Sequence, residues 1–388
     1  MVILRIVMRS SRGSLELLNI ELVPFFYSID NPWARVKFFN MIKFFQLIAE
    51  GKDGFSFGKS WRYSEDSLVA LLPILRVAPK KKRGYVLLSE AKNVKIEDTG
   101  HINKLLIENN EKSPVYIRMG EMFTGGSQER MATRSYIVMP KEKIKIDVRC
   151  VHASKGINTG VTMTSSGIAP SSFDSHLCSA GFKMRSIEQR EVWKNVDNVA
   201  QSFCCASREM YNAGDDTADS PININDERTT GSRLGQVDIT PGIDSTTIPI
   251  YSFTDDLMGN IDKFSDQIKN ILQKVPYFEN QVGVSLVDLQ GISAVECFDL
   301  KDSWKKFKDE IIKKEGDKIS KQQKNSPFQY KEERAKESLK IVLKADYEEK
   351  TLFKSKDWRI IGLKNENYTG EIVELKDKPI HLLLVRNK

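Results

Sequence analysis

Apolar and charged residues alternate most regularly in residues 143–150. The apolar positions are Ile144, Ile146, Val148 and Cys150, and the charged positions are Lys143, Lys145, Asp147 and Arg149. Successive side chains of a strand point to opposite faces, so this alternation predicts a strand with one buried and one exposed face. Other apolar segments separated by turn residues predict antiparallel hairpins at 104–119, 281–299 and 371–385.

Apolar residues at helical spacing mark other parts of the chain. Such stripes predict helices at 260–275, 302–315 and 328–343, and a further helix is expected around 186–205. Together these elements predict an α+β fold, in which several helices flank a β-rich core of antiparallel hairpins.

Changes in composition along the chain indicate its organisation. Residues 1–60 are rich in aromatic side chains and form an N-terminal segment that either docks on the main domain or binds a protein partner; translation from Met41 is an alternative. Residues 61–388 form the main domain, in which the Ser-, Thr- and Gly-rich segment 152–185 is expected to be irregular. Residues 208–250 are too long and polar for an ordinary connection and predict an insertion.

The net charge is small but unevenly distributed. The chain has 59 basic and 52 acidic residues, a net charge of +7. Residues 301–344 carry 13 Lys and one Arg against eight acidic residues, a net charge of +6, whereas residues 208–228 carry two Arg against six acidic residues, a net charge of −4. This balance argues against a dedicated nucleic-acid-binding protein, and leaves weak nucleic-acid binding by the Lys-rich helices as an alternative.

The cysteine content and the apolar runs bear on location. Five Cys residues are too few, and odd in number, for a disulfide framework. No apolar run reaches the roughly 18 residues that a transmembrane helix needs, and the N-terminus lacks the pattern of a signal peptide. We therefore expect a reduced, cytoplasmic protein without a transmembrane segment.

A polar segment between two predicted strands carries the strongest candidate chemistry. Its residues are Arg118, Glu121, Gly125, Gly126, Gln128 and Arg130. Glu121 could act as a general base or as a metal ligand, while Gln128 and Arg130 could bind a carboxylate or phosphate. The two glycines would allow the backbone to approach a ligand closely. The alternative is that Glu121 and Arg130 pair with each other across the turn.

Two further sets of residues are weaker candidates. Cys150 and His152 share one face of the predicted strand, so a catalytic Cys–His pair is conceivable, although an inert buried Cys is favoured. Asp174, His176 and Cys178 are ligand-type residues, but their spacing matches no established zinc motif and we expect no metal site. The chain also lacks the GxGxxG, GxxxxGK[ST], HExxH and GxSxG motifs, and its sequence leaves the identity of any cofactor unknown.

Several of these segments together resemble a known family. The segment Arg118 to Arg130, the following SYIVMPKEKIKIDVRCVH, and a helix start that reads Gln189-Arg-Glu-Val-Trp193 are similar to the ARPP domain, which is associated with ADP-ribosylglycohydrolase and rhodanese-phosphatase proteins. The hairpin at 281–299 and the terminal hairpin resemble the C-terminal part of that domain, so the likeness spans roughly residues 70–388. It implies a link to NAD and ADP-ribose metabolism and a ligand-binding role for Gln189, but no mechanism.

The chain departs from the family pattern at three positions. Met122, Glu129 and His152 stand where the family has an acid, an Asn and an acid. Any role of those acids in metal binding or catalysis would be altered or lost in this chain. The sequence thus favours binding or processing of an ADP-ribose-type or other phosphorylated nucleotide metabolite, with a non-catalytic protein-interaction module as the alternative.

Overall fold

The computed structural model describes residues 2–11, 14–24, 44–65, 67–77, 82–126, 128–151, 159–185, 187–196, 265–315 and 330–387 of the chain. It divides into two units, Met1–Phe44 and Phe45–Lys388. In the first unit, β1 (Val2–Ser11) and β2 (Ser14–Pro24) form an antiparallel pair. The predicted division at residue 60 and the predicted insertion at 208–250 stay predictions, and the insertion lies outside the described residues.

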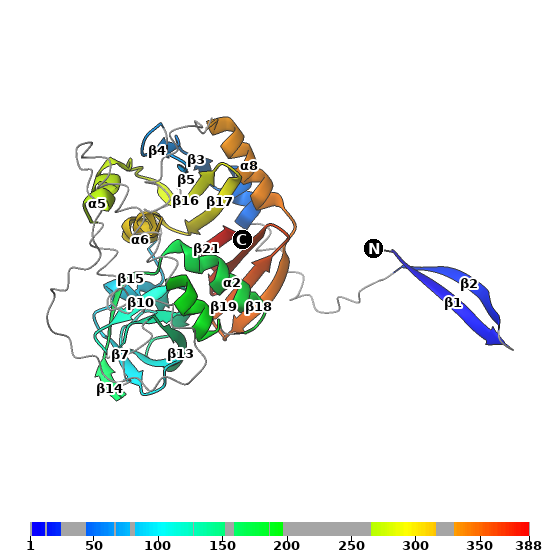
Figure 1. The fold of residues 1–388 in the computed structure, drawn as a ribbon, viewed down its shortest axis with the longest axis horizontal. Helices are drawn as coiled ribbons and strands as arrows, with labels where there is room; N and C mark the ends of the chain where they lie inside the picture. The colour runs from blue at the N-terminus through cyan, green and yellow to red at the C-terminus, as the bar shows by residue number, and fades with distance from the viewer. Residues whose placement is uncertain are drawn as a thin grey trace, which may run out of the picture. The chain divides into compact units, whose positions relative to one another are not determined.

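A nine-stranded antiparallel sheet is the largest element of the second unit (Figure 1). Its strands, in spatial order, are β18 (Glu348–Lys354), β19 (Trp358–Lys364), β20 (Tyr368–Leu375), β21 (Lys378–Arg386), β17 (Gly291–Phe298), β16 (Gln281–Asp288), β5 (Ala70–Arg76) and β3 (Phe55–Phe57), with β4 (Trp61–Arg62) also paired to β5. The central strands β16, β17, β20 and β21 are buried on both faces, so buried residues follow one another along them instead of alternating with exposed ones.

A second sheet closes on itself. Its order is β14 (Thr159–Thr162), β7 (Val94–Thr99), β8 (Lys104–Asn109), β13 (Lys143–Cys150), β11 (Arg130–Ala132), β10 (Glu121–Thr124) and β15 (Thr164–Ile168). The first and last of these strands are separated in sequence by Met163 alone, whose backbone N–H donates to Ile96 O at 2.9 Å. The two ends of the sheet therefore meet along residues 159–168, and we call this sheet the barrel.

A small sheet and several helices complete the second unit. The small sheet has the order β12 (Tyr136–Val138), β9 (Val115–Ile117) and β6 (Val86–Leu87). The helical elements include η1 (Leu88–Glu90), η2 (Ser171–Phe173), α2 (Asp174–Phe182), α5 (Ser265–Lys274), α6 (Lys301–Lys314) and α8 (Glu332–Lys344). Residues 44–49 and 189–196 are also helical.

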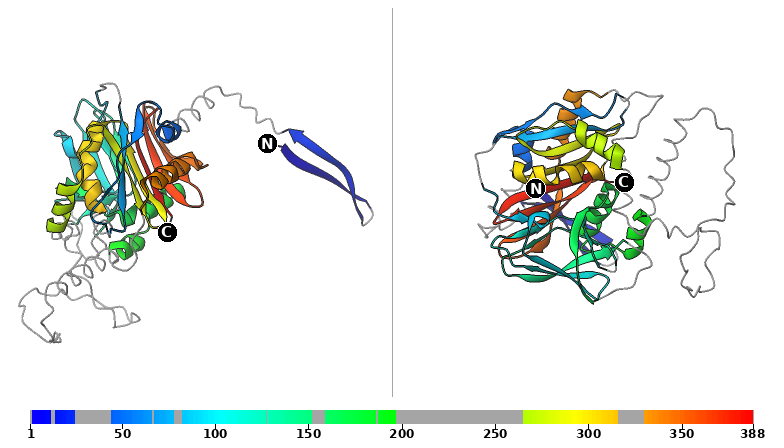
Figure 2. Two further views of the ribbon diagram at one scale, coloured as in Figure 1. Left: turned by 90° about the horizontal axis from the view of Figure 1, so that it is seen from above. Right: turned by 90° about the vertical axis from the view of Figure 1, so that its left-hand side faces the viewer.

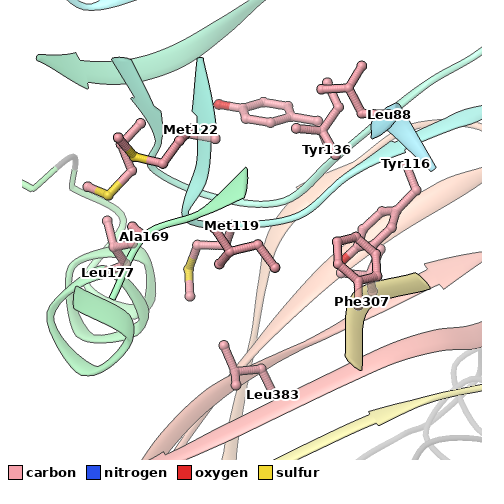
Figure 3. Close-up of a cluster of buried hydrophobic side chains, with 14 of the residues drawn as sticks. Leu88, Tyr116, Met119, Met122, Tyr136, Ala169, Leu177, Phe307 and Leu383 are labelled. Atoms are coloured by element: carbon pink, nitrogen blue, oxygen red, sulfur yellow. The ribbon is translucent and has the colours of Figure 1, made fainter. Parts of the chain in front are cut away.

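Helices α6 and α2 lie between the nine-stranded sheet and the barrel. Helix α6 contacts β16 and β17 of the sheet and β15 of the barrel, while α2 contacts β18 to β21. Figure 2 shows α8 on the opposite face of the sheet from α6. Buried apolar side chains fill the layer between the nine-stranded sheet and the barrel. Met122 of the barrel lies near Leu177 of α2, and Tyr116 lies near Phe307 of α6 (Figure 3).

The α+β class and the hairpins at 281–299 and 371–385 are confirmed by the pairs β16–β17 and β20–β21. The hairpin predicted at 104–119 is wrong, because β8 pairs with β7 and β13 while β9 pairs with β12 and β6. Asn109 separates the two strands: its side-chain amide donates to Val138 O at 2.8 Å and Ser113 O at 3.0 Å, and so turns the chain away. Both strands have apolar runs, and proximity in sequence did not determine their partners.

Two other expectations are corrected. Residues 159–182, expected to be irregular, form β14, β15, η2 and α2. Arg149, expected on an exposed face, is only 8% exposed, since its Nε donates to Ile187 O at 2.7 Å and its Nη1 to Val148 O at 2.8 Å. The segment before the 189–196 helix therefore covers a face that strand periodicity alone assigns to solvent.

Candidate functional site

A tight turn joins β9 to β10 and carries Arg118 and Glu121 at its two ends. The backbone N–H of Glu121 donates to Arg118 O at 3.1 Å, and Gly120, the third residue of the turn, has φ +80°. Glycine adopts this conformation without strain, and a Cβ here would also lie 3.4 Å from Arg118 Nη1. The turn thereby directs the two charged side chains into two different buried surroundings.

Arg118 belongs to a set of buried ionisable groups that we call the charge network: Arg118, Asp174, Glu296, Lys314 and His381. Arg118 binds Glu296 through two bonds, Nε to Oε1 at 2.6 Å and Nη2 to Oε2 at 3.0 Å. Lys314 Nζ donates to Glu296 Oε2 at 2.8 Å and to Asp174 Oδ2 at 2.7 Å. Two cations thus face two carboxylates, and each of these side chains is at most 2% exposed.

The charge network draws on distant parts of the chain. Glu296 comes from β17, Lys314 from the last turn of α6, and Asp174 from the first turn of α2. The helix dipoles favour these positions, since a helix favours an anion at its N-terminus and a cation at its C-terminus. Although burial opposes ionisation, Arg118 and Lys314 hold the pKa of Glu296 well below its usual range, and Glu296 and Asp174 raise the pKa of Arg118.

Glu121 lies beside the charge network in a less complete environment. It is 3% exposed, and its Oε1 accepts a hydrogen bond from Ser165 Oγ. Its Oε2 is buried and has no hydrogen-bond partner among the residues that the structure describes. Burial raises the pKa of Glu121 to about 7, against the opposing effects of Ser165 and of the Arg118 charge.

The strand opposite Glu121 is irregular. The register between β10 and β15 shifts at Met122/Phe123, so that Ser166 is an extra residue between the pairs Met122–Gly167 and Phe123–Ser165. The Ser166 hydroxyl is buried and likewise lacks a partner within the described part of the chain. Bulges of this kind often occur next to active sites, where they redirect a side chain. Glu121, Ser165 and Ser166 together form what we call the Glu121 site.

Arg130 and Gln128 lie inside the barrel rather than in an open anion site. Arg130 Nη1 donates to Gln128 Oε1, and Nη2 donates to Asp98 Oδ2 at 3.3 Å. Two strands separate β7 from β11 in the sheet, so the Arg130–Asp98 ion pair spans the barrel interior. Arg130 is fully buried, and Glu121 bonds to Ser165 instead, so the alternative of a Glu121–Arg130 pair is not what the structure shows.

The two glycines adjust the barrel wall. Gly125 has φ +99°, and a Cβ on it would lie 3.2 Å from Thr162 O. A Cβ on Gly126 would lie 3.3 Å from the Met163 side chain. Their close neighbour is therefore the chain's own 159–168 segment.

Gln189 and Cys150 contact each other at the end of β13. Gln189 Oε1 accepts from the Cys150 backbone N–H at 3.1 Å, and Gln189 Nε2 donates to Cys150 O. Cys150 is fully buried and faces Arg130 in the strand register. Gln128, Arg130, Cys150 and Gln189 are thus neighbours, whereas Glu121 has its own surroundings; His152 lies outside the described residues.

The Asp174, His176 and Cys178 set is on helix α2, where residues two apart point in different directions. Asp174 binds Lys314, and the pKa of Cys178 is raised well above its usual range by burial. Among the described residues, no group of three or more His, Cys, Asp and Glu side chains is arranged to hold a metal ion. A shallow hollow lined by Asp346, Tyr347, Glu348, Lys364, Asn365 and Glu366 involves none of these groups.

Sequence reasoning missed most of the charge network. Glu296 and His381 interrupt the apolar runs ISAVECF and IHLLLV, and a lone polar residue in such a run is a signal that could have identified both. Lys314 had no such signal, because it is one of many lysines in its segment.

Comparison with known proteins places this geometry in a family. None of the helices that the structure describes is long and apolar enough to cross a membrane. No curated protein and no solved structure matches the chain. A family model described as the ARG and Rhodanese-Phosphatase-superfamily-associated Protein domain, ARPP-1, matches residues 55–385. These residues include the barrel, the nine-stranded sheet apart from its last residue, Arg386, and every residue of the charge network and the Glu121 site. The chain therefore belongs to the ARPP-1 domain family.

Proposed function

We propose that this chain binds or processes an ADP-ribose-type, NAD-derived or other phosphorylated nucleotide metabolite, with Glu121 as its proton-transferring group. The observation that carries the proton-transfer role is the Glu121 carboxyl itself: it is buried, one oxygen has no partner in the described part of the chain, and its pKa is raised to about 7. The ligand class follows from the family, whose name links it to ADP-ribosylglycohydrolase-type and rhodanese-phosphatase proteins.

A carboxyl group with a pKa near neutrality suits general acid–base catalysis. Such a group is present in both protonation states at pH 7, so it can accept a proton in one step and return it in the next. The fixed Arg118–Glu121 turn and the Ser165 hydroxyl would orient the carboxyl. The half-buried positions of Ser165 and Ser166 place the Glu121 site near the surface of the barrel.

The geometry gives Gln128 and Arg130 partners within the chain: Arg130 Nη1 donates to Gln128 Oε1 and Nη2 donates to Asp98 Oδ2. A phosphate at the Glu121 site would instead meet the Ser166 hydroxyl, which has no partner in the described part of the chain, whereas Ser165 donates to Glu121. In this proposal the barrel pair Arg130–Asp98 is a structural element.

Isothermal titration of the whole chain with ADP-ribose and with NAD tests the proposal, together with mass spectrometry of the incubated ligands. We expect heat with at least one ligand, and either a changed affinity or at least a tenfold loss of product in Glu121→Gln. Glu371→Gln is the matched control, since Glu371 is also buried, also bonds to a serine and also has a pKa raised to about 7. Absence of heat and of product with both ligands would refute the proposal.

A non-catalytic interaction module is the second candidate. The specific observation that favours it is the completeness of the charge network, in which two cations and two carboxylates satisfy one another without a ligand. Buried pairs of this kind can fix one arrangement of elements rather than perform chemistry. Light scattering after size exclusion of the whole chain tests it: a defined mass above that of a monomer, with no heat from nucleotide ligands, is the expected result.

A further inference from the structure

A chain of hydrogen bonds extends from the charge network to a second buried carboxyl, Glu371 of β20. Ser135 Oγ donates to Glu371 Oε1, and the Tyr116 hydroxyl lies 3.4 Å from Ser135 Oγ. Tyr116 OH lies 2.9 Å from His381 Nδ1, and His381 Nε2 lies 3.2 Å from Glu296 Oε1. All five side chains are at most 2% exposed, so solvent does not compete for these bonds.

Elementary donor and acceptor rules fix the direction of most of this chain. The ionised Glu296 carboxylate can only accept, so His381 must carry its proton on Nε2. Burial lowers the pKa of His381, so the ring is neutral near pH 7 and Nδ1 is an acceptor. Tyr116, whose phenol pKa is raised well above its usual range by burial, therefore donates its proton to Nδ1.

The remaining proton, on Ser135, can point in either of two directions. When Glu371 is ionised, Ser135 must donate its proton to Glu371, while Tyr116 donates its proton to His381. No proton then lies between the Ser135 and Tyr116 oxygens. This arrangement agrees with the long 3.4 Å separation of their oxygens, compared with the much shorter bond from Ser135 to Glu371. Ser135 Oγ also accepts the Met119 backbone N–H at 2.9 Å, which fixes the oxygen while the proton remains free to rotate.

We propose that Glu371 is a buried proton-binding switch that reverses the donor order of this chain: ionised, it accepts from Ser135, and protonated, it donates to Ser135, which then donates to Tyr116. One proton from solvent binds Glu371, and the Ser135 hydroxyl rotates from Glu371 toward Tyr116. No covalent bond within the protein is broken. In the protonated state the bonds from Glu371 to Glu296 all run in one direction, which strengthens the Tyr116–His381 bond cooperatively.

The surroundings of Glu371 are mixed in charge. The groups that affect the pKa of Glu371 are Ser135 and Arg134 from the loop before β12, Arg118 from the β9–β10 turn, and Asp174 from α2. The charge of Glu371 in turn affects the pKa of Tyr116 in β9 and of Cys178 in α2. Burial has the largest effect and raises the pKa of Glu371 to about 7, whereas Ser135, Arg118 and Arg134 oppose the rise. The switch would therefore operate close to neutral pH.

Nuclear magnetic resonance of the whole chain, with ¹⁵N in its four histidines, tests the proposal without any ligand. The His381 ring nitrogens, assigned from the spectrum of His381→Gln, are followed from pH 5 to pH 9. We expect the His381 Nδ1 resonance to shift in one step centred near pH 7, while Nε2 keeps its proton throughout.

Three variants distinguish the switch from the titration of a different group and from a charge effect through space. In Glu371→Gln the amide can donate to Ser135 at every pH, so the Nδ1 resonance should stay at its low-pH position. In Ser135→Ala the chain is interrupted, so the step should be lost even though Glu371 still titrates. In Glu121→Gln, the matched control, the step should persist with its midpoint unchanged.

Each contrary result overturns the proposal. Absence of a step in the wild-type chain means that Glu371 does not reverse the chain. A step that persists in Glu371→Gln shows that another group titrates, and a step that persists in Ser135→Ala shows that charge acts through space rather than through the hydroxyls. Because none of these measurements uses a nucleotide, their outcome is independent of the proposed function.

Discussion

Substitution of Arg118 by Met tests whether the charge network stabilises the fold. It removes a guanidinium that binds both oxygens of Glu296 and leaves two carboxylates facing the single cation Lys314. Loss of one partner of a buried ion pair typically costs about 3–5 kcal/mol of unfolding free energy. Glu296 keeps Lys314 at 2.8 Å and His381 at 3.2 Å, so we expect the lower end of this range, about 3 kcal/mol.

Urea denaturation of the whole chain measures this loss, and the protein offers a matched control. Arg386 also binds a carboxylate, Asp288, but the two side chains are 23% and 24% exposed, so Arg386→Met should cost about 1 kcal/mol or less. The double variant Arg118→Met/Glu296→Leu leaves Lys314 paired with Asp174 and should regain much of the loss. If Arg118→Met costs no more than Arg386→Met, the reasoning about the buried network is refuted.

Three further predictions concern the neighbouring residues. The raised pKa of Glu121 contributes stability that is present below its ordinary pKa of 4.5 and is lost as the pH rises through about 7. The unfolding free energy of Glu121→Gln should therefore fall less between pH 5 and pH 8 than that of the wild type, by up to about 3 kcal/mol. Equal slopes of unfolding free energy against pH in the two proteins would contradict this. Gly120→Ala, at φ +80° and against Arg118, should cost about 1–3 kcal/mol in thermal unfolding, and a smaller loss than that of an exposed Gly→Ala control would argue against a strained turn. Gln189→Leu should speed amide hydrogen exchange at Cys150, whose N–H loses its acceptor, and unchanged exchange would show that the Gln189 contact does not protect β13.

Local pattern was sufficient to predict the fold class and the hairpins whose strands are adjacent in the sequence. The pairs β16–β17 and β20–β21 are of this kind, each joined by a short turn. It failed for β8 and β9, where two apolar runs are near in sequence but belong to different sheets. Periodicity reports that a strand has a buried face, but not which strand or helix covers that face.

The candidate site shows the same limit. The sequence identified the Arg118–Glu121 turn, because a glycine beside two charges is a local signal. Glu296 lies 178 positions from Arg118, and Asp174 lies 140 positions from Lys314, so no local pattern could have paired them. Gln128 and Arg130 were expected to bind an anion because of their residue types, yet the barrel supplies Asp98 as an internal partner.

Closure of the barrel also affects how this protein behaves at high concentration. Strand edges with unpaired backbone groups are sites at which chains can associate, and closure gives each inner strand of the barrel, from β7 to β10 in the sheet order, a neighbour on both sides. The nine-stranded sheet, by contrast, has one of its edges at β18, whose sequence EEKTLFK is mostly exposed and contains two Glu and two Lys residues. Charged side chains on an edge discourage the addition of another strand. Protection from edge-to-edge aggregation is therefore topological for the inner strands of the barrel and electrostatic at the β18 edge of the nine-stranded sheet.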